Sequence, residues 1–165
     1  MKSGFSIHVI RENLKFSAAH FMAYPGFREP LHGHNYQIGV RLEGKLGFNG
    51  YVLDFGLIKQ LTKEIADRLN ERTIIPAKSD CLTIERIGNE LSVLYGNDHF
   101  AFPFSDVALL PIVHSSAEEL ARYIWHELRD SLQAHNALSQ VVTLEISVAE
   151  APGQTAIYCD NIAKL

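Results

Sequence analysis

The sequence predicts a single α+β domain in which an antiparallel sheet is covered on one face by two helices. Three observations lead to this fold class. Segments near both ends alternate apolar and polar residues, two longer segments repeat apolar residues at the helical period, and the order is strand, strand, helix, insertion, helix, strand. The chain has 165 residues with neither an internal repeat nor a linker, so we expect one domain over residues 1–165.

The first half of the chain begins with strand patterns. Residues 5–10 and 14–21 are rich in β-forming side chains, and residues 35–44 alternate strongly. The apolar face of this third segment consists of Tyr36, Ile38, Val40 and Leu42. A turn with two glycines, KLGFNG, follows, so we expect 35–44 to form a hairpin with YVLDF at 51–55.

Two helices are predicted from their caps and periodicity. Asp54 is placed to cap a helix over roughly 56–71. Its buried stripe should consist of Leu57, Ile58, Leu61, Ile65 and Leu69. Ser115 or Ser116 caps the second helix, whose first turn carries two glutamates.

The remaining segments are shorter strands. Residues 72–113 are irregular, and within them 81–88 and 90–96 indicate a hairpin turned at Gly88-Asn89. A long strand is expected at 141–150, with a further one at 155–159.

Composition excludes several classes of protein. The net charge of −4 and the lack of a basic run argue against a general nucleic-acid binder. No apolar stretch approaches the roughly 20 residues that span a bilayer, and the first residues lack a secretory signal pattern, so we expect a cytoplasmic protein. Cys81 and Cys159 show no metal-binding spacing and are expected to be free thiols.

A pair of histidines in LHGHNY is the strongest chemical feature. His32 and His34 lie two residues apart at the start of a predicted strand, so their rings point to the same face. His20, at the end of FSAAHF, is the natural third ligand. Three neutral histidines without a thiolate are typical of a zinc site that keeps one position open for chemistry. The alternative is that the pair are strand-end histidines bonded to the backbone.

The chain resembles the 6-pyruvoyltetrahydropterin synthase and 6-carboxytetrahydropterin synthase superfamily along nearly its whole length. The segments that carry the resemblance are FSAAHF, LHGHNYQIGVRLEG, GYVLDFGLIK, PIVHSSAEELARYIW and ISVAEAPGQTA. The resemblance implies the tunnelling fold, in which six subunits assemble as two stacked trimeric barrels with sites at subunit interfaces. It also implies that His20, His32 and His34 hold a catalytic zinc ion.

One departure from the family pattern concerns the catalytic base. Most members carry a cysteine four residues before the first histidine of the pair, where this chain has Arg28. The sequence Glu29-Pro-Leu-His32-Gly-His34 resembles a variant branch, found among apicomplexan parasites and some bacteria, in which a glutamate replaces that cysteine. The resemblance implies conversion of 7,8-dihydroneopterin triphosphate to 6-hydroxymethyl-7,8-dihydropterin, a folate precursor. Glu29 would then be the base, unless it is a solvated loop charge.

The choice of a carboxylate fits that product. Glutamate has an ordinary pKa of about 4.3 against about 8.5 for cysteine, so it is the weaker base. Taking a proton from a metal-bound hydroxyl demands less of a base than taking one from carbon. Loss of the proton from the second side-chain hydroxyl permits a retro-aldol cleavage that leaves one carbon on the ring.

A second departure concerns proton transfer. Family members end the first long helix with Leu-Asp-His, whereas this chain has Leu69-Asn70-Glu71. Glu71 takes over the role, or His114 does, or the site works without a relay. Both residues could also be structural, Glu71 at a helix end and His114 beside a helix cap.

The resemblance further implies how the pterin is bound. Glu150 matches a glutamate that grips the 2-amino and N3 edge, a task that suits a carboxylate because it accepts two parallel N–H bonds. Ser115 and Ser116 would complete the pocket. The competing functions are a pyruvoyl-forming synthase and a zinc- and pterin-binding protein without turnover.

Overall fold

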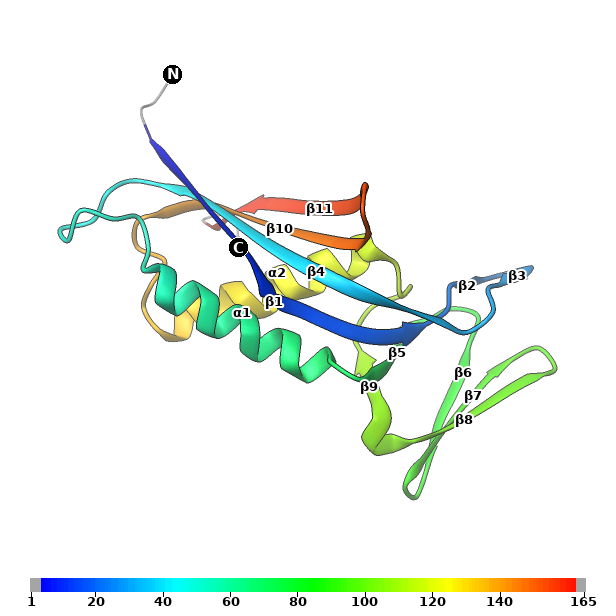
Figure 1. Ribbon diagram of the computed structural model, residues 1–165. Coiled ribbons are helices and arrows are strands. Elements are labelled where there is room, and N and C mark those ends of the chain that lie inside the picture. The colour runs from blue at the N-terminus through cyan, green and yellow to red at the C-terminus, as the bar shows by residue number, and fades with distance from the viewer. Residues whose placement is uncertain (1–3, 163–165) are drawn as a thin grey trace.

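The computed structural model describes residues 4–162. Both helices lie on one face of a large sheet, and no helix of residues 4–162 covers the opposite face (Figure 1). A small sheet and a short hairpin lie together at one end of the large sheet (Figure 1). The α+β fold class expected from the sequence is therefore confirmed. No helix in the described range is long and apolar enough to cross a membrane.

The large sheet has six strands in the order β11-β10-β4-β1-β5-β9. In chain order these are β1 (Phe5–His20), β4 (His32–Gly44), β5 (Arg72–Pro76), β9 (Val107–Leu110), β10 (Val141–Ala151) and β11 (Gln154–Asn161). The pairs β11–β10, β10–β4 and β4–β1 are antiparallel, as expected. The pairs β1–β5 and β5–β9 are parallel, so the sheet is mixed at one edge. β5 runs parallel to β1 because α1 carries the chain from the far end of β4 back to Ser17 on β1, whose carbonyl accepts from the Glu71 N–H, and β5 continues in the same direction.

Five shorter strands form the two smaller pieces. β2 (Ala23–Tyr24) and β3 (Phe27–Arg28) make a hairpin, and the small sheet has the order β6-β7-β8. Its strands are β6 (Thr83–Ile87), β7 (Glu90–Tyr95) and β8 (Asp98–Pro103), and a 3-10 turn over Phe104–Asp106 follows. The predicted turn at Gly88-Asn89 is confirmed, and Gly88 adopts the left-handed φ of 60° that favours glycine.

The two helices begin at the predicted caps. α1 (Phe55–Leu69) starts after Asp54, whose side chain accepts a hydrogen bond from the Leu57 N–H. α2 (Ala117–Ala134) starts after Ser116, whose hydroxyl accepts from the Glu119 N–H. Their buried faces pack against the large sheet, and the indole N–H of Trp125 donates to the Leu144 carbonyl at 2.7 Å. This contact fixes α2 on β10.

The apolar interior is divided into two clusters. The larger one lies between the large sheet and the helices, and it includes the expected face of β4 and the predicted stripe of α1, with Leu57 at its margin. The smaller one lies under the small sheet and has Phe21, Ala23, Ile75, Leu91 and Val93 at its centre. The small sheet is therefore anchored on the segment that follows β1.

Strand β1 contains a bulge that changes which of its residues face the helices. Ile10 pairs with Gly39 but Lys15 pairs with Gln37, so β1 advances by five residues while β4 advances by two. The Gln37 amide donates to the carbonyls of Arg11 and Leu14 and stabilises the extra residues. Strand β1 therefore contains three extra residues, and an odd number of extra residues exchanges its two faces. Odd-numbered positions such as Val9 are buried before the bulge, whereas even-numbered positions are buried after it.

The predicted hairpin between 35–44 and 51–55 is wrong. Residues 51–54 form no strand, although Val52 and Leu53 are buried as predicted strand residues would be. β4 already pairs with β1 on one side and β10 on the other, and Gly44 has partners on both. No edge of β4 remains for a hairpin. The loop after β4 therefore packs Val52 and Leu53 into the core without forming strand hydrogen bonds.

Candidate metal and substrate site

The three histidines meet where β1 ends and β4 begins. His20 lies opposite His32 in the strand register, and His34 lies two pairs further along β4, opposite Ala18. One ligand atom from each ring can be chosen so that all lie within 4.8 Å of one another. The three rings lie on the face of the sheet that the helices cover. Because α2 begins only at Ala117, the helix leaves one side of the cluster uncovered.

Backbone carbonyls orient two of these rings. His20 Nδ1 lies 2.8 Å from the Ser115 carbonyl, and His32 Nδ1 lies 2.9 Å from the Pro30 carbonyl. A ring nitrogen bonded to a carbonyl must carry the proton, so the Nε2 lone pair of each ring is left free for a ligand. His20 Nε2 is buried and has no hydrogen-bond partner in the described structure. Burial, opposed by the bond to Ser115, lowers the pKa of His20 and favours the neutral ring.

This donor set fits a divalent metal ion. Neutral imidazoles held by carbonyls are the usual ligands of catalytic zinc, and a cation bound between the three rings would give the unpartnered His20 Nε2 a partner.

Glu29 is held beside the cluster by the segment that follows His20. Its Oε2 accepts a hydrogen bond from the Met22 N–H at 3.0 Å, and its own N–H donates to the Met22 carbonyl at 2.9 Å. The β2–β3 hairpin thus closes back on itself with Glu29 opposite Met22. One carboxylate oxygen is fixed by the backbone, and Glu29 is not a freely solvated loop charge.

A cavity of about 370 Å³ joins these groups. Its lining residues are His20, Met22, Glu29, His32, His34, Ser116, Ala117, Glu118, Glu150, Gln154, Thr155 and Ala156. Glu150 enters it from β10, at a break in the register with β11 between Ala149 and Ala151. Such a break re-aims a side chain, and it brings a further carboxylate to the cavity beside those of Glu29 and Glu118.

Tyr36 lies next to the cluster on β4. Its ring contacts those of His20 and His34, with centroids 5.9 and 5.5 Å apart. Burial and the nearby charge of Glu150 raise the pKa of Tyr36, so its hydroxyl stays protonated.

The two serines at the start of α2 have different positions. Ser116 lines the cavity and caps the helix. Ser115 is fully buried, and its hydroxyl donates to the Phe21 carbonyl at 2.8 Å while its carbonyl accepts from His20. Its side chain does not line the cavity, because it connects the end of β1 to the start of α2.

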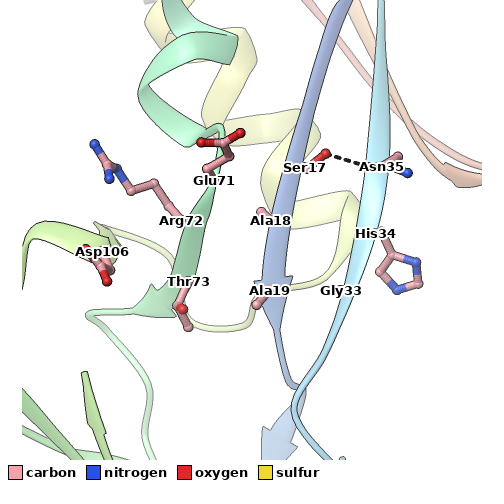
Figure 2. A pocket seen from close by; sticks show the side chains of 10 residues that line it. All are labelled: Ser17, Ala18, Ala19, Gly33, His34, Asn35, Glu71, Arg72, Thr73 and Asp106. Atoms are coloured by element: carbon pink, nitrogen blue, oxygen red, sulfur yellow. Dashed lines mark hydrogen bonds between the residues drawn. The ribbon is translucent and has the colours of Figure 1, made fainter. Parts of the chain in front are cut away.

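Glu71 and His114 are not brought into the cavity within the described part of one chain. Glu71 has a left-handed φ of 56° and lies in another hollow of about 500 Å³ with Arg72 and Asp106. Figure 2 shows Glu71 and His34 on opposite sides of β1, with the His34 ring pointing away from that strand. His114 is half-buried, and its Nδ1 has no hydrogen-bond partner there.

Several cavity residues escape sequence reasoning. Met22 lies in the connection after β1, Glu118 on α2, and Gln154 and Thr155 on β11, three places that only the fold brings together. Tyr36 could have been found, because it lies two residues after His34 on the same strand and so shares its face.

Comparison with known proteins identifies the family of this chain. The sequence model of the 6-pyruvoyl tetrahydropterin synthase family matches residues 9–161. The chain belongs to this family. Members of the 6-pyruvoyl tetrahydropterin synthase family are lyases that act on pterins and typically use a divalent metal ion.

Individual relatives cover nearly the whole chain. A curated relative from Methanocaldococcus jannaschii, whose name proposes a 6-carboxy-5,6,7,8-tetrahydropterin synthase, is 35% identical over 90% of this chain and 91% of its own. The solved 6-pyruvoyl tetrahydropterin synthase of Plasmodium falciparum superposes with a TM-score of 0.92 at 36% identity, covering 97% of this chain and 99% of that one.

The Plasmodium vivax 6-pyruvoyl tetrahydropterin synthase also has a TM-score of 0.92, at 33% identity over 97% of this chain and 99% of that one. Two solved variants of that protein replace a catalytic glutamate, one by alanine and the other by cysteine.

Proposed function

We propose that the protein is a zinc-dependent lyase that cleaves the side chain of 7,8-dihydroneopterin triphosphate to give 6-hydroxymethyl-7,8-dihydropterin for folate synthesis. The observation that carries the proposal is the Glu29 carboxylate, which shares one cavity with the histidine cluster. Neither Cys81 nor Cys159 lines that cavity. A catalytic glutamate in the similar Plasmodium vivax protein supports the same role for Glu29.

His20, His32 and His34 would hold the zinc ion. A bound Zn²⁺ would act as a Lewis acid toward the hydroxyl groups of the substrate side chain. The carbonyls of Ser115 and Pro30 support this role, since they keep two of the rings in the tautomer and orientation that a metal requires.

Glu29 would act as the general base. It accepts the proton of the second side-chain hydroxyl, the electrons of that O–H bond form the carbonyl of a leaving aldehyde, and the C–C bond beside it breaks. The electrons of that bond pass to the dihydropterin imine, and return of a proton to the remaining carbon leaves a hydroxymethyl group. The Met22 N–H fixes one oxygen of Glu29, so the other is free to take the proton.

Glu150 and Ser116 would bind the pterin. A carboxylate on the cavity wall can accept two parallel N–H bonds from the guanidine-like edge of the ring. Glu71 or His114 would return the proton. Because Glu71 lies in a separate hollow, it would reach a substrate only at a site completed by a neighbouring subunit.

We also propose a homohexamer built as a dimer of trimers. Strands β9 and β11 are the two edges of the large sheet, and they pair with no further strand in the described chain. Edges of this kind can be closed by joining sheets of neighbouring copies into a barrel. The expected cytoplasmic location remains a prediction.

Product analysis tests the proposed reaction. The zinc-loaded protein is incubated with 7,8-dihydroneopterin triphosphate, and the pterins are separated by chromatography and identified by mass. We expect 6-hydroxymethyl-7,8-dihydropterin as the main product. A pyruvoyl product would favour the synthase activity in the family's name, and bound pterin without any product would favour a binding protein.

A further inference from the structure

Arg28 connects the segment that carries Glu29 to the small sheet. Its Nε donates to the Asp98 carboxylate at 2.8 Å, and its Nη1 donates to the Glu29 carbonyl at 2.7 Å. The guanidinium carbon also lies 5.1 Å from the centre of the Phe100 ring. One side chain therefore joins the backbone of Glu29 to two residues of β8.

Two more contacts tie the same region to the small sheet. The Tyr95 hydroxyl donates to the Tyr24 carbonyl at 3.0 Å, so the β2–β3 hairpin is held near its tip. Phe100 stacks on Phe21 with ring centroids 4.9 Å apart, and Phe21 directly follows the metal-ligand candidate His20. The small sheet thus contacts the segment between His20 and Glu29 at its beginning, middle and end.

The environment of Arg28 leaves it little capacity to bind a substrate anion. Its side chain is 21% exposed, two of its five N–H donors are engaged by Asp98 and Glu29, and it does not line the cavity. From these contacts we infer that Arg28 and Asp98 are positioning residues, through which the small sheet holds Glu29 in place for the reaction. This inference rests on the proposed role of Glu29 as the base.

The test uses Asp98→Ala, which leaves the Glu29 side chain untouched. Asp67→Ala is the matched control, since Asp67 is an exposed ion-pair partner on α1, 55% exposed against 53% for Asp98, and is far from the cavity in the fold. Arg28→Lys is the second variant, because lysine keeps the charge but lacks the planar fork that reaches both partners.

The first measurement is hydrogen exchange of residues 22–32 in the full chain without substrate. We expect severalfold faster exchange in Asp98→Ala and Arg28→Lys than in the wild type, and unchanged exchange in Asp67→Ala, because the segment loses its tether. Unchanged exchange in both test variants would overturn the inference, whether or not the protein turns over substrate.

The second measurement separates positioning from general destabilisation. We expect kcat for Asp98→Ala to fall about 10- to 100-fold with KM unchanged, because a base displaced by a fraction of an ångström is inefficient. In a Glu29→Gln background the same change should have no further effect. An equal loss in both backgrounds would overturn the inference.

Failure of the proposed function would give a different result. If Glu29→Gln retains wild-type turnover, Glu29 is not the base, and the exchange measurement alone then decides whether Asp98 holds the segment. If Glu29→Gln is inactive and Asp98→Ala is fully active, the function stands and the positioning role is wrong.

Discussion

Single hydrogen bonds determine what the residues of this cavity can do. The Ser115 carbonyl directs His20 Nε2 toward the other two rings, and the Met22 N–H occupies one oxygen of Glu29. In both bonds the group that holds the side chain, the Ser115 carbonyl or the Met22 N–H, belongs to the backbone, so both constraints come from backbone that the fold has already fixed. The cavity is therefore arranged before any ligand binds, as preorganised catalytic sites are.

Replacing Glu29 by glutamine should abolish most turnover without releasing the metal. The amide keeps the size of the side chain but cannot accept the hydroxyl proton, so kcat should fall by roughly 10²–10⁴-fold. Steady-state kinetics and elemental analysis of the same preparation measure both effects. Glu64→Gln, on the exposed face of α1, is the control. Wild-type turnover in Glu29→Gln would remove Glu29 from the mechanism.

Replacing His32 by alanine should release zinc, since the two remaining histidines bind the ion more weakly than three histidines do. Elemental analysis after dialysis should show a large loss of zinc against the wild type. His8→Ala serves as the control, because His8 is exposed on β1 at a distance from the cluster. Full zinc occupancy in His32→Ala would contradict the assignment of this ligand.

At the scale of elements, local signals determined what could be predicted. Both helices were found from an N-cap and an apolar period, which act within a few residues. β5 could not be predicted, because RTIIP is short and is a strand only through its pairing with β1 and β9. The false hairpin at 51–55 has the same origin, as nothing local shows that both sides of β4 are occupied.

The residues of the candidate site likewise divide into those that a local motif predicts and those that only the fold brings together. His32, His34 and Glu29 come from one short motif, and the structure places all three at one cavity. Ser115 shows the limit of such reasoning, because whether its hydroxyl or that of Ser116 faces the cavity depends on which of them is the cap. The link between Arg28 and Asp98 spans 70 residues of sequence, and no spacing rule could indicate it.

The cap of α1 gives a prediction at this scale. Asp54→Ala removes the acceptor for the Leu57 N–H, so the free energy of unfolding should fall by about 0.5–2 kcal/mol. Denaturant titration followed by tryptophan fluorescence measures the change. Asp67→Ala, inside the same helix, should have a smaller effect, and zinc content should be unchanged in both. Equal stability of Asp54→Ala and the wild type would show that the cap contributes nothing.

At the scale of the whole molecule, the open sheet edges predict assembly. Light scattering during gel filtration should give six times 18.5 kDa, about 111 kDa. Ile157 is 61% exposed on the edge strand β11, and Ile157→Asp should reduce that mass, because a charge there opposes burial against a neighbouring copy.

A matched control for this measurement is Ile87→Asp. Ile87 is 57% exposed but belongs to the small sheet, so the mass should stay unchanged. A wild-type mass of one chain would contradict the hexamer.

The bulge in β1 limits how the length of this protein can vary. The three extra residues between Ile10 and Lys15 bring even positions, including His20, to the face that the helices cover. Deletion of one residue there would turn either His20 or the first half of the strand to the wrong face, and deletion of two would restore both. Natural length variants of this segment should therefore differ by even numbers of residues, although the segment does not line the cavity beside the histidine cluster.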